Sequence, residues 1–259
     1  MYTELLNIIF KYAKNFKLPD KDFVNNVIDV IANYDDINDY INNVDISSSY
    51  KYAASYTFCS RILKLGICDI ITRAETNFNA YCEIYNLKKT EKYIFICYYF
   101  VYTIFHELDH TRQNKILNTT KKDNFERILI QNSVDVLVAN FEIYEKEHDL
   151  FPNERMAIIN SCVRINEMLK YDDYASSFIG NIYSQRYKFA ITQYYLDKKV
   201  PLIEYTNAVG TSIYYDNVFV SNENTNKLLT RVKKDILFEN RVLFGLPISN
   251  NELNKMISK

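Results

Sequence analysis

Residues that interrupt regular structure are scarce in this sequence. Its 259 residues include only four glycines and four prolines, the two residue types that most often end helices and strands. The scarcity predicts long, uninterrupted elements, most of them helices. The glycines are also isolated from one another, which excludes a glycine-rich loop of the kind that cradles phosphate groups.

Closely spaced cysteine pairs are absent as well. The five cysteines are spread widely, with no C-x-x-C spacing: they are Cys59, Cys68, Cys82, Cys97 and Cys162. An odd number at such spacings favours neither a disulfide framework nor a cysteine-type zinc site. Reduced thiols in a cytosol are the simplest account of this pattern.

No excess of charge of either sign marks the chain. Its formal net charge is −1, which gives no broad electrostatic reason to expect nucleic acid or an anionic membrane as a partner. One short basic stretch, at 227–234, is interpreted as a solvated helix face rather than a phosphate-binding surface.

Segments that would enter or cross a membrane are also missing. The first residues lack the basic segment and the small-residue cleavage site of an export signal. The uncharged run from Tyr93 to Phe105 is shorter than the roughly 20 residues that cross a bilayer, so it predicts a helix buried in a protein core. We therefore expect a cytoplasmic protein without a membrane partner.

What is present is a series of helical patterns with one good strand candidate in the first half. That candidate is Ala54–Leu65, which mixes apolar and polar residues in rough alternation and ends near Gly66. Helices are expected within 1–45, with Asp20 as an N-cap, from about Glu91 past Gln113, and near 125–147, 154–169, 174–195 and 225–244, with a strand or hairpin at 210–220. The pattern predicts an α+β, predominantly helical fold with a small sheet. The segments 1–50, 51–172 and 173–259 are expected to form one continuous compact unit.

The stretch FHELDHTRQ, residues 105–113, carries the clearest chemical signal. His106 and His110 are two of the three histidines in the chain, and four-residue spacing places them on one face of a helix. Glu107 follows the first histidine, about 100° around the helix, where it can reach a water molecule bound to a metal. This is the H-E-x-x-H arrangement of two zinc ligands and a general base. The alternative is a solvated helix face on which the same side chains make ordinary local contacts.

The apolar run that leads into this motif favours the metal-site interpretation. Residues 93–105 would fix the helix in the core, so the histidines would face the floor of a cleft rather than bulk solvent. Rigid support of this kind is what a metal site requires.

A zinc hydrolase site needs a third protein ligand and leaves the fourth position to water. Glu154 is the preferred candidate, because it lies in the first turn of a helix that follows Pro152, with the small Ala157 one turn later. The other candidates are His148, Glu142, Glu145 and Glu147. An acid in the first turn would also complement the helix dipole without binding a metal.

Two segments resemble a known family. HELDHTRQ is similar to the H-E-L-x-H-x-x-Q form of zincin-type metallopeptidases, and HDLFPNERMA, residues 148–157, resembles a P-x-E-R-x-A segment of uncharacterised HExxH proteins from Firmicutes phages and mobile elements. The resemblance covers about 54–169. As in gluzincins, it implies His106, His110 and Glu154 as ligands, Glu107 as the base, and a zincin-like core with a small sheet packed on the HExxH helix.

Two polar residues, Asp109 and Gln113, lie within or next to the motif. Asp109 departs from the neutral residue that many zincins have inside the motif, and we expect it to point to solvent rather than to orient an imidazole. Gln113, one turn after His110, either helps to fix that histidine or is a surface amide.

The function expected from these residues is that of a zinc-dependent metallopeptidase. Zinc would lower the pKa of a bound water, Glu107 would take its proton, and a peptide or protein would be the substrate. One alternative is a catalytically inactive zincin-like scaffold that acts as a protein-interaction module. Another is a helical structural protein that binds no metal.

Overall fold

The computed structural model describes residues 1–85, 87–122, 124–139, 141, 145, 148 and 151–184. The chain divides into two compact units, of which unit 1 comprises Met1–Arg127 and Ala157–Ser184, and unit 2 contains Ile128–Met156. The elements expected beyond residue 184, including the strand or hairpin at 210–220 and the helix at 225–244, lie outside the described residues. The expected boundaries at 50 and 172 stay predictions.

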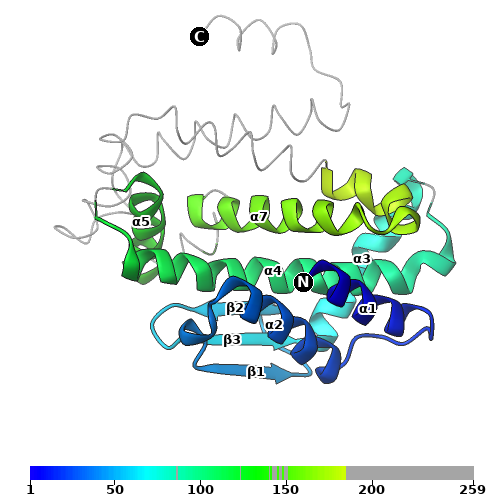
Figure 1. Cartoon of the computed structure of the whole chain (residues 1–259), viewed down its shortest axis with the longest axis horizontal. Coiled ribbons are helices and arrows are strands. Elements are labelled where there is room, and N and C mark those ends of the chain that lie inside the picture. Colours follow the sequence, from blue (N-terminus) through cyan, green and yellow to red (C-terminus); the bar gives the residue numbers. More distant parts are fainter. Residues whose placement is uncertain are drawn as a thin grey trace, which may run out of the picture. The chain divides into compact units, whose positions relative to one another are not determined.

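Helix α4, Lys92–Thr119, runs through unit 1 and confirms the long helix expected from the sequence. Most of its first half is buried, including Phe95, Tyr98 and Phe100, because the run at 93–105 is rich in apolar side chains and has no charged one. Helices α1, Tyr2–Ala13, and α2, Lys21–Asp35, pack on it (Figure 1). Burial of these apolar faces is the main force that holds the three helices together.

The sheet has three short strands, β1 Asn43–Ser47, β2 Ala54–Thr57 and β3 Ile62–Gly66, in the order β1-β3-β2. Strand β3 pairs in parallel with β1 and antiparallel with β2. The single strand expected over 54–65 is therefore wrong, since the segment folds into a hairpin. The Arg61 N–H donates to the Thr57 carbonyl at 2.7 Å, and Arg61 has a φ of 54°, so the turn closes without a glycine.

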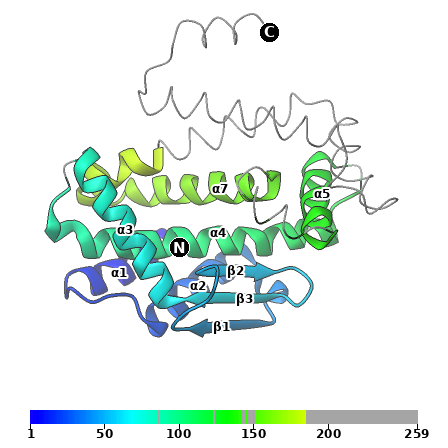
Figure 2. The same cartoon turned by 180° about the vertical axis from the view of Figure 1, so that it is seen from behind.

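The sheet is fastened to α4 by a buried amide. Asn114 Nδ2 donates to the Tyr56 hydroxyl and to the Phe58 carbonyl, both at 2.9 Å, and the Tyr56 hydroxyl donates to the Tyr40 carbonyl at 2.8 Å. Figures 1 and 2 show the strands along one side of α4 and helix α7 along another. The α+β, predominantly helical class with a small sheet is confirmed at this level.

Gly66 marks the junction between β3 and helix α3, Ile67–Tyr85, a helix not assigned from the sequence. The Asp69 carboxylate accepts the Tyr50 N–H at 2.6 Å next to this glycine. A Cβ at position 66 would lie 2.6 Å from Asp69 Oδ2 and 2.7 Å from Tyr50 N. The close approach of these groups leaves room only for glycine.

The remaining described elements are α5 Phe125–Ala139, α7 Pro152–Leu169, a helical segment at 173–184, and the 3-10 turns Asn38–Tyr40 and Lys89–Glu91. Helix α7 is bound to α2 by an ion pair between Arg164 Nη1 and Asp35 Oδ2 at 2.6 Å. Asp172 accepts from the Tyr98 hydroxyl at 2.8 Å and from the Ala175 N–H at 3.0 Å. It therefore caps the 173–184 helix and binds that helix to α4.

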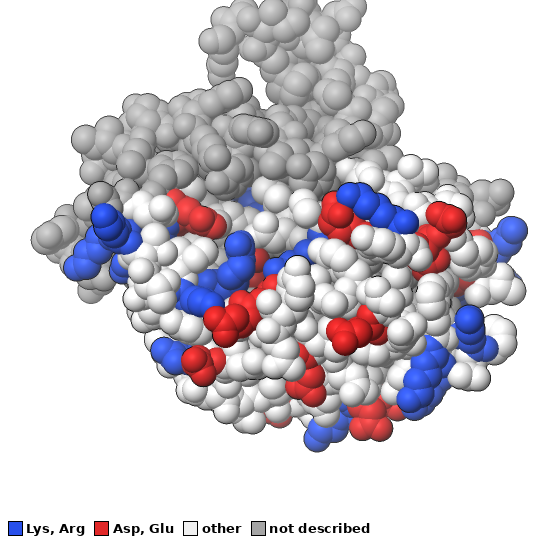
Figure 3. Space-filling view, viewed as in Figure 1, with Lys and Arg blue, Asp and Glu red and all other residues white. Residues whose placement is uncertain are grey.

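None of the helices in the described ranges is long and apolar enough to cross a bilayer. On the face drawn in Figure 3, lysines and arginines are interspersed with aspartates and glutamates over the described residues. This mixture agrees with the near-neutral net charge of the chain.

Asp20 confirms the expected cap of α2 and gives a pH-dependent prediction. Its carboxylate accepts from the Phe23 N–H, the Tyr12 hydroxyl and Lys17 Nζ. Burial raises the pKa of Asp20, but the interactions with Lys17, Tyr12 and the Phe23 N–H outweigh it and lower the pKa from 3.8 to about 2. The charged form therefore contributes stability that is complete above pH 4, where the unfolded carboxyl is ionised, and is lost as the pH falls towards 2.

We expect Asp20→Ala to lower the free energy of unfolding by about 1 kcal/mol at pH 7, the usual cost of removing a cap. Asp20→Asn retains a capping oxygen but no charge, so its deficit relative to the wild type should shrink as the pH falls from 5 to 2. Urea unfolding at several pH values measures both effects. A deficit for Asp20→Asn that is the same at every pH would contradict the assignment.

Candidate metal centre

The second half of α4 places the two motif histidines one turn apart. His110 is 5% exposed and His106 is half-buried; their ring centroids are 4.9 Å apart and their Nε2 atoms 3.3 Å apart. Two imidazole nitrogens bound to one tetrahedral zinc at about 2.0–2.1 Å lie about 3.3 to 3.4 Å from each other. The histidines thus already have the nitrogen separation that a shared ion requires.

Glu154 joins these histidines from the first turn of α7, as the sequence predicts. The division between the two units falls inside α7, which is an unbroken helix from Pro152 to Leu169. His106, His110 and Glu154 each offer one ligand atom, and these three atoms all lie within 4.8 Å of one another. Two imidazoles and a carboxylate are the donor set of many catalytic zinc sites, although the same donors bind other first-row metals.

The Glu154 carboxylate is buried, with a relative exposure of 3%, and has neighbours for both oxygens. Asn153 Nδ2 donates to Oε1 at 3.0 Å, and His148 Nε2 lies 3.2 Å from Oε2. Such contacts orient a ligating carboxylate. The exposed His148, the second candidate for third ligand, therefore lies beside Glu154 and outside the group of three that the described residues form.

Of the other acids considered as third ligands, Glu145 is described and does not belong to this group. Glu145 is exposed, whereas Glu142 and Glu147 lie outside the described residues. The predicted base, Glu107, is 7% exposed and lies between His106 and His110 in the same turn of α4. Its buried carboxylate is thus adjacent in sequence to a candidate ligand, and its role as a base stays a prediction.

Asp109 does not point to solvent, which corrects the expectation from the sequence. It is 4% exposed; its Oδ1 accepts from Arg112 Nε at 2.8 Å and from Asn160 Nδ2 at 3.0 Å, and its Oδ2 accepts from Gln113 Nε2 at 3.2 Å. Burial lowers the pKa of Arg112, but the Asp109 carboxylate raises it more, so the net shift is upward and Arg112 stays charged.

Gln113 is fully buried, so it is not the surface amide that the sequence allowed. Its Oε1 lies 3.0 Å from His110 Nδ1. The sequence contains a local sign of this contact, because residues three and four apart on a helix are neighbours. Nothing local reveals the Asn160 contact to Asp109, since Asn160 lies on another helix.

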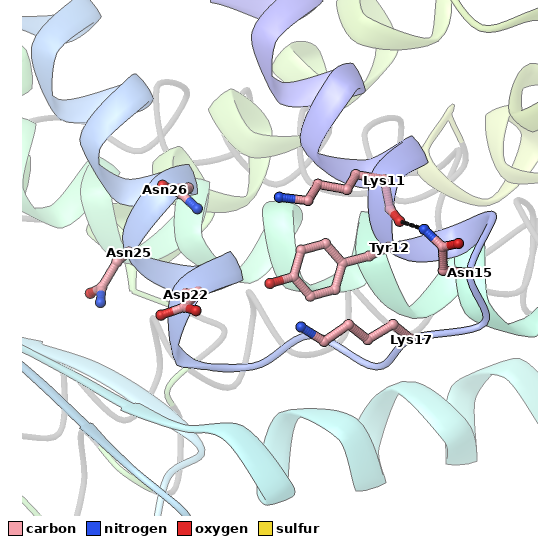
Figure 4. A pocket seen from close by; sticks show the side chains of 7 residues that line it. All are labelled: Lys11, Tyr12, Asn15, Lys17, Asp22, Asn25 and Asn26. Atoms are coloured by element: carbon pink, nitrogen blue, oxygen red, sulfur yellow. Dashed lines mark hydrogen bonds between the residues drawn. The ribbon is translucent and has the colours of Figure 1, made fainter.

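A pocket of about 330 Å³ lies elsewhere in unit 1, lined by Lys11, Tyr12, Asn15, Lys17, Asp22, Asn25 and Asn26 (Figure 4). Lys17 pairs with Asp20 at 2.6 Å, and its Nζ lies 4.5 Å from the centre of the Tyr12 ring. Asn15 Nδ2 donates to the Lys11 carbonyl at 2.7 Å. The lining has no histidine or cysteine and shares no residue with the group of His106, His110 and Glu154.

Comparisons with protein-family models, curated proteins and solved structures gave no match. The resemblance to zincins is therefore carried by the motif residues alone, and it stays a prediction.

Proposed function

We propose that this chain is a zinc-dependent metallopeptidase. The observation that carries the proposal is the convergence of His106, His110 and Glu154, whose ligand atoms lie within 4.8 Å of one another, around the helix turn that bears Glu107. Three protein ligands from two imidazoles and one carboxylate leave a fourth position open, which distinguishes catalytic zinc sites from structural ones.

Each residue of this group has a distinct task in the proposed reaction. His106, His110 and Glu154 would hold the ion, which when bound supplies a Lewis acid and lowers the pKa of water. Glu107 would accept a proton from the attacking water and deliver it to the amine that leaves. The position of Glu154 in α7, a later helix than the one that bears the histidines, supports a gluzincin-like arrangement.

The buried Glu107 carboxylate favours hydrolysis over a purely structural metal site. A structural site needs ligands, but it gains nothing from an additional carboxylate removed from water, because burial of a charge is costly. Glu107 is 7% exposed and directly follows His106 in sequence, and a proton-transfer role would account for a carboxylate at this position. A scaffold that binds partners without cleaving them would not need this residue.

The ligand set predicts how the metal content changes in variants. We expect wild-type protein to hold about one equivalent of zinc, and His106→Ala and Glu154→Ala each to weaken zinc binding by at least about 100-fold. Structural zinc sites bind with about 10–16 kcal/mol over four ligands, which assigns about 3 kcal/mol to each. Elemental analysis after dialysis and competition with a chromophoric chelator measure stoichiometry and affinity.

His148→Gln is the matched control, because His148 contacts Glu154 without belonging to the group of three; it should bind zinc at least tenfold more tightly than Glu154→Ala. A wild type with less than about half an equivalent of zinc, no different from His106→Ala, would refute the metal site. If His148→Gln loses zinc and Glu154→Ala does not, His148 replaces Glu154 as the ligand. Zinc-loaded protein that cleaves no member of a broad peptide library would instead support the interaction scaffold.

A further inference from the structure

A chain of hydrogen bonds in α4 leads from Asp109 through Gln113 to His110. Gln113 Nε2 donates to Asp109 Oδ2 at 3.2 Å, and Gln113 Oε1 lies 3.0 Å from His110 Nδ1. All three side chains are buried: Gln113 is 0%, Asp109 4% and His110 5% exposed. The three residues belong to unit 1.

The direction of each bond in this chain follows from the chemistry of its first member. An ionised carboxylate can only accept hydrogen bonds, so the NH₂ end of Gln113 must face Asp109. The carbonyl end of Gln113 must then face His110, and it too can only accept. His110 therefore has to donate from Nδ1, which leaves Nε2, the atom 3.3 Å from His106 Nε2, as the unprotonated nitrogen.

We propose that Gln113, oriented by Asp109, is a positioning residue that holds the proton of neutral His110 on Nδ1 and so presents Nε2 to a metal ion. This proposal rests on the proposed metal site, and it adds the two residues that set the tautomer of one of its ligands. An imidazole fixed in the required tautomer has neither to exchange its proton nor to rotate before it binds, so the ion meets a preformed ligand.

Two further side chains decide which oxygen of Asp109 is available to Gln113. Arg112 Nε and Asn160 Nδ2 both donate to Oδ1, at 2.8 and 3.0 Å. Oδ2 is thereby left for Gln113. Asn160 comes from α7, so the orientation of Gln113 depends on the packing of α7 against α4.

This arrangement makes Asp109→Asn an isosteric test. Arg112 and Asn160 would keep the asparagine carbonyl at the Oδ1 position, so its NH₂ group would face Gln113. Two donors cannot bond to each other, and Gln113 would have to turn its carbonyl towards Asn at position 109. Its NH₂ group would then face His110 Nδ1, which would become an acceptor, and the histidine proton would move to Nε2.

The double variant Asp109→Asn/Gln113→Glu should restore the original direction. A carboxylate at 113 accepts from the asparagine NH₂ group with one oxygen and from His110 Nδ1–H with the other. The exchange also keeps the net charge of the wild type. A residue that merely filled space at 113 would give no such rescue.

The tautomer can be measured without any metal. The chain has three histidines, so histidine labelled with ¹⁵N gives a simple two-bond correlation spectrum, which His106→Gln and His148→Gln assign. At pH 8, above the usual histidine pKa of about 6.5, metal-free wild type should show His110 protonated on Nδ1. Asp109→Asn should show it on Nε2, and the double variant on Nδ1 again.

Zinc affinity, measured by chelator competition, provides the second readout. We expect Asp109→Asn to bind zinc about 10–100-fold more weakly, as is usual when the partner of a ligating histidine is lost, and the double variant to recover most of that loss. Asp36→Asn is the control, because it removes the same charge from a side chain that is 96% exposed. It should change neither tautomer nor affinity.

A wild-type His110 protonated on Nε2 would overturn the proposal, as would an Asp109→Asn protein that keeps both the Nδ1 tautomer and wild-type affinity. If Asp109→Asn does not fold, the wild-type spectrum alone decides between the two tautomers. The spectrum is recorded without metal. An Nδ1 tautomer in a protein that binds no zinc would therefore refute the proposed function but not the positioning role of Gln113. Zinc binding with the opposite tautomer would refute only the positioning role of Gln113.

Discussion

Glu107→Gln is expected to abolish peptide hydrolysis while the protein keeps its zinc. Glutamine has the shape of glutamate but cannot accept a proton at neutral pH, so the loss should lie in kcat, by roughly 10²–10⁴-fold. Zinc binding should persist, because Glu107 contributes no atom to the group formed by His106, His110 and Glu154. Single-turnover cleavage of a fluorogenic peptide selected from a library, with the metal content determined on the same sample, measures both quantities.

Glu145→Gln is the matched control for this substitution. Glu145 is an exposed glutamate outside the group of three, so the same chemical change there should leave both hydrolysis and zinc content within about twofold of the wild type. A Glu107→Gln protein that retains more than about a tenth of the wild-type rate would show that another group takes the proton. Loss of zinc in Glu107→Gln would instead make Glu107 part of the ligand set.

Within the group of His106, His110 and Glu154, the two histidines were predictable because they have a local sequence signal. The four-residue spacing of His106 and His110 fixes their common face once the segment is helical, and the apolar run before them leaves little alternative to a helix. Glu154 was predicted less directly, from a proline that opens its helix and from a resemblance. Its proximity to the histidines depends on how α7 lies along α4, which no local pattern contains.

The parts that sequence reasoning missed depend on long-range contacts. The turn within 54–65 has no glycine or Asn-Gly pair, so the sequence predicts one strand for the whole segment. In the structure, Arg61 adopts a positive φ and closes a hairpin. Strand β1 carries an asparagine, an aspartate and a serine around its two apolar residues and is defined by parallel pairing with β3. Parallel strands are joined by a crossover connection rather than a tight turn, so the residues of the strand itself do not indicate which partner it pairs with.

Asp109 shows the same limit at the level of one side chain. A charged residue inside a helix is more often exposed than buried, and its neighbours in sequence include an arginine that can pair with it in water. Burial became favourable only because Asn160 and Gln113 also donate to the carboxylate. The resulting network connects α7 to the histidine-bearing turn, so the packing of the core and the geometry of the site are determined by the same contacts.

Phe105→Ala is expected to lower the free energy of unfolding by about 3–5 kcal/mol, the usual cost of truncating a buried phenylalanine. Phe105 ends the apolar run of α4 and is 2% exposed. Its ring lies 5.2 Å from the guanidinium of Arg164, the residue that pairs with Asp35 of α2. The substitution would therefore leave a cavity directly before His106 and remove a cation–π contact worth about 0.5–1 kcal/mol.

Urea unfolding, followed by circular dichroism, measures this loss, and Tyr34→Ala is its control. Tyr34 is also an aromatic residue on a helix, but it is 67% exposed, so its truncation should change the unfolding free energy by no more than about 0.5 kcal/mol. If Phe105→Ala does not fold, Phe105→Leu should show a smaller loss of the same sign, since it leaves a smaller cavity. A loss below about 1 kcal/mol for Phe105→Ala would mean that the ring before the histidines is not part of the core, and the rigid support of the proposed metal centre would have to come from other residues of α4.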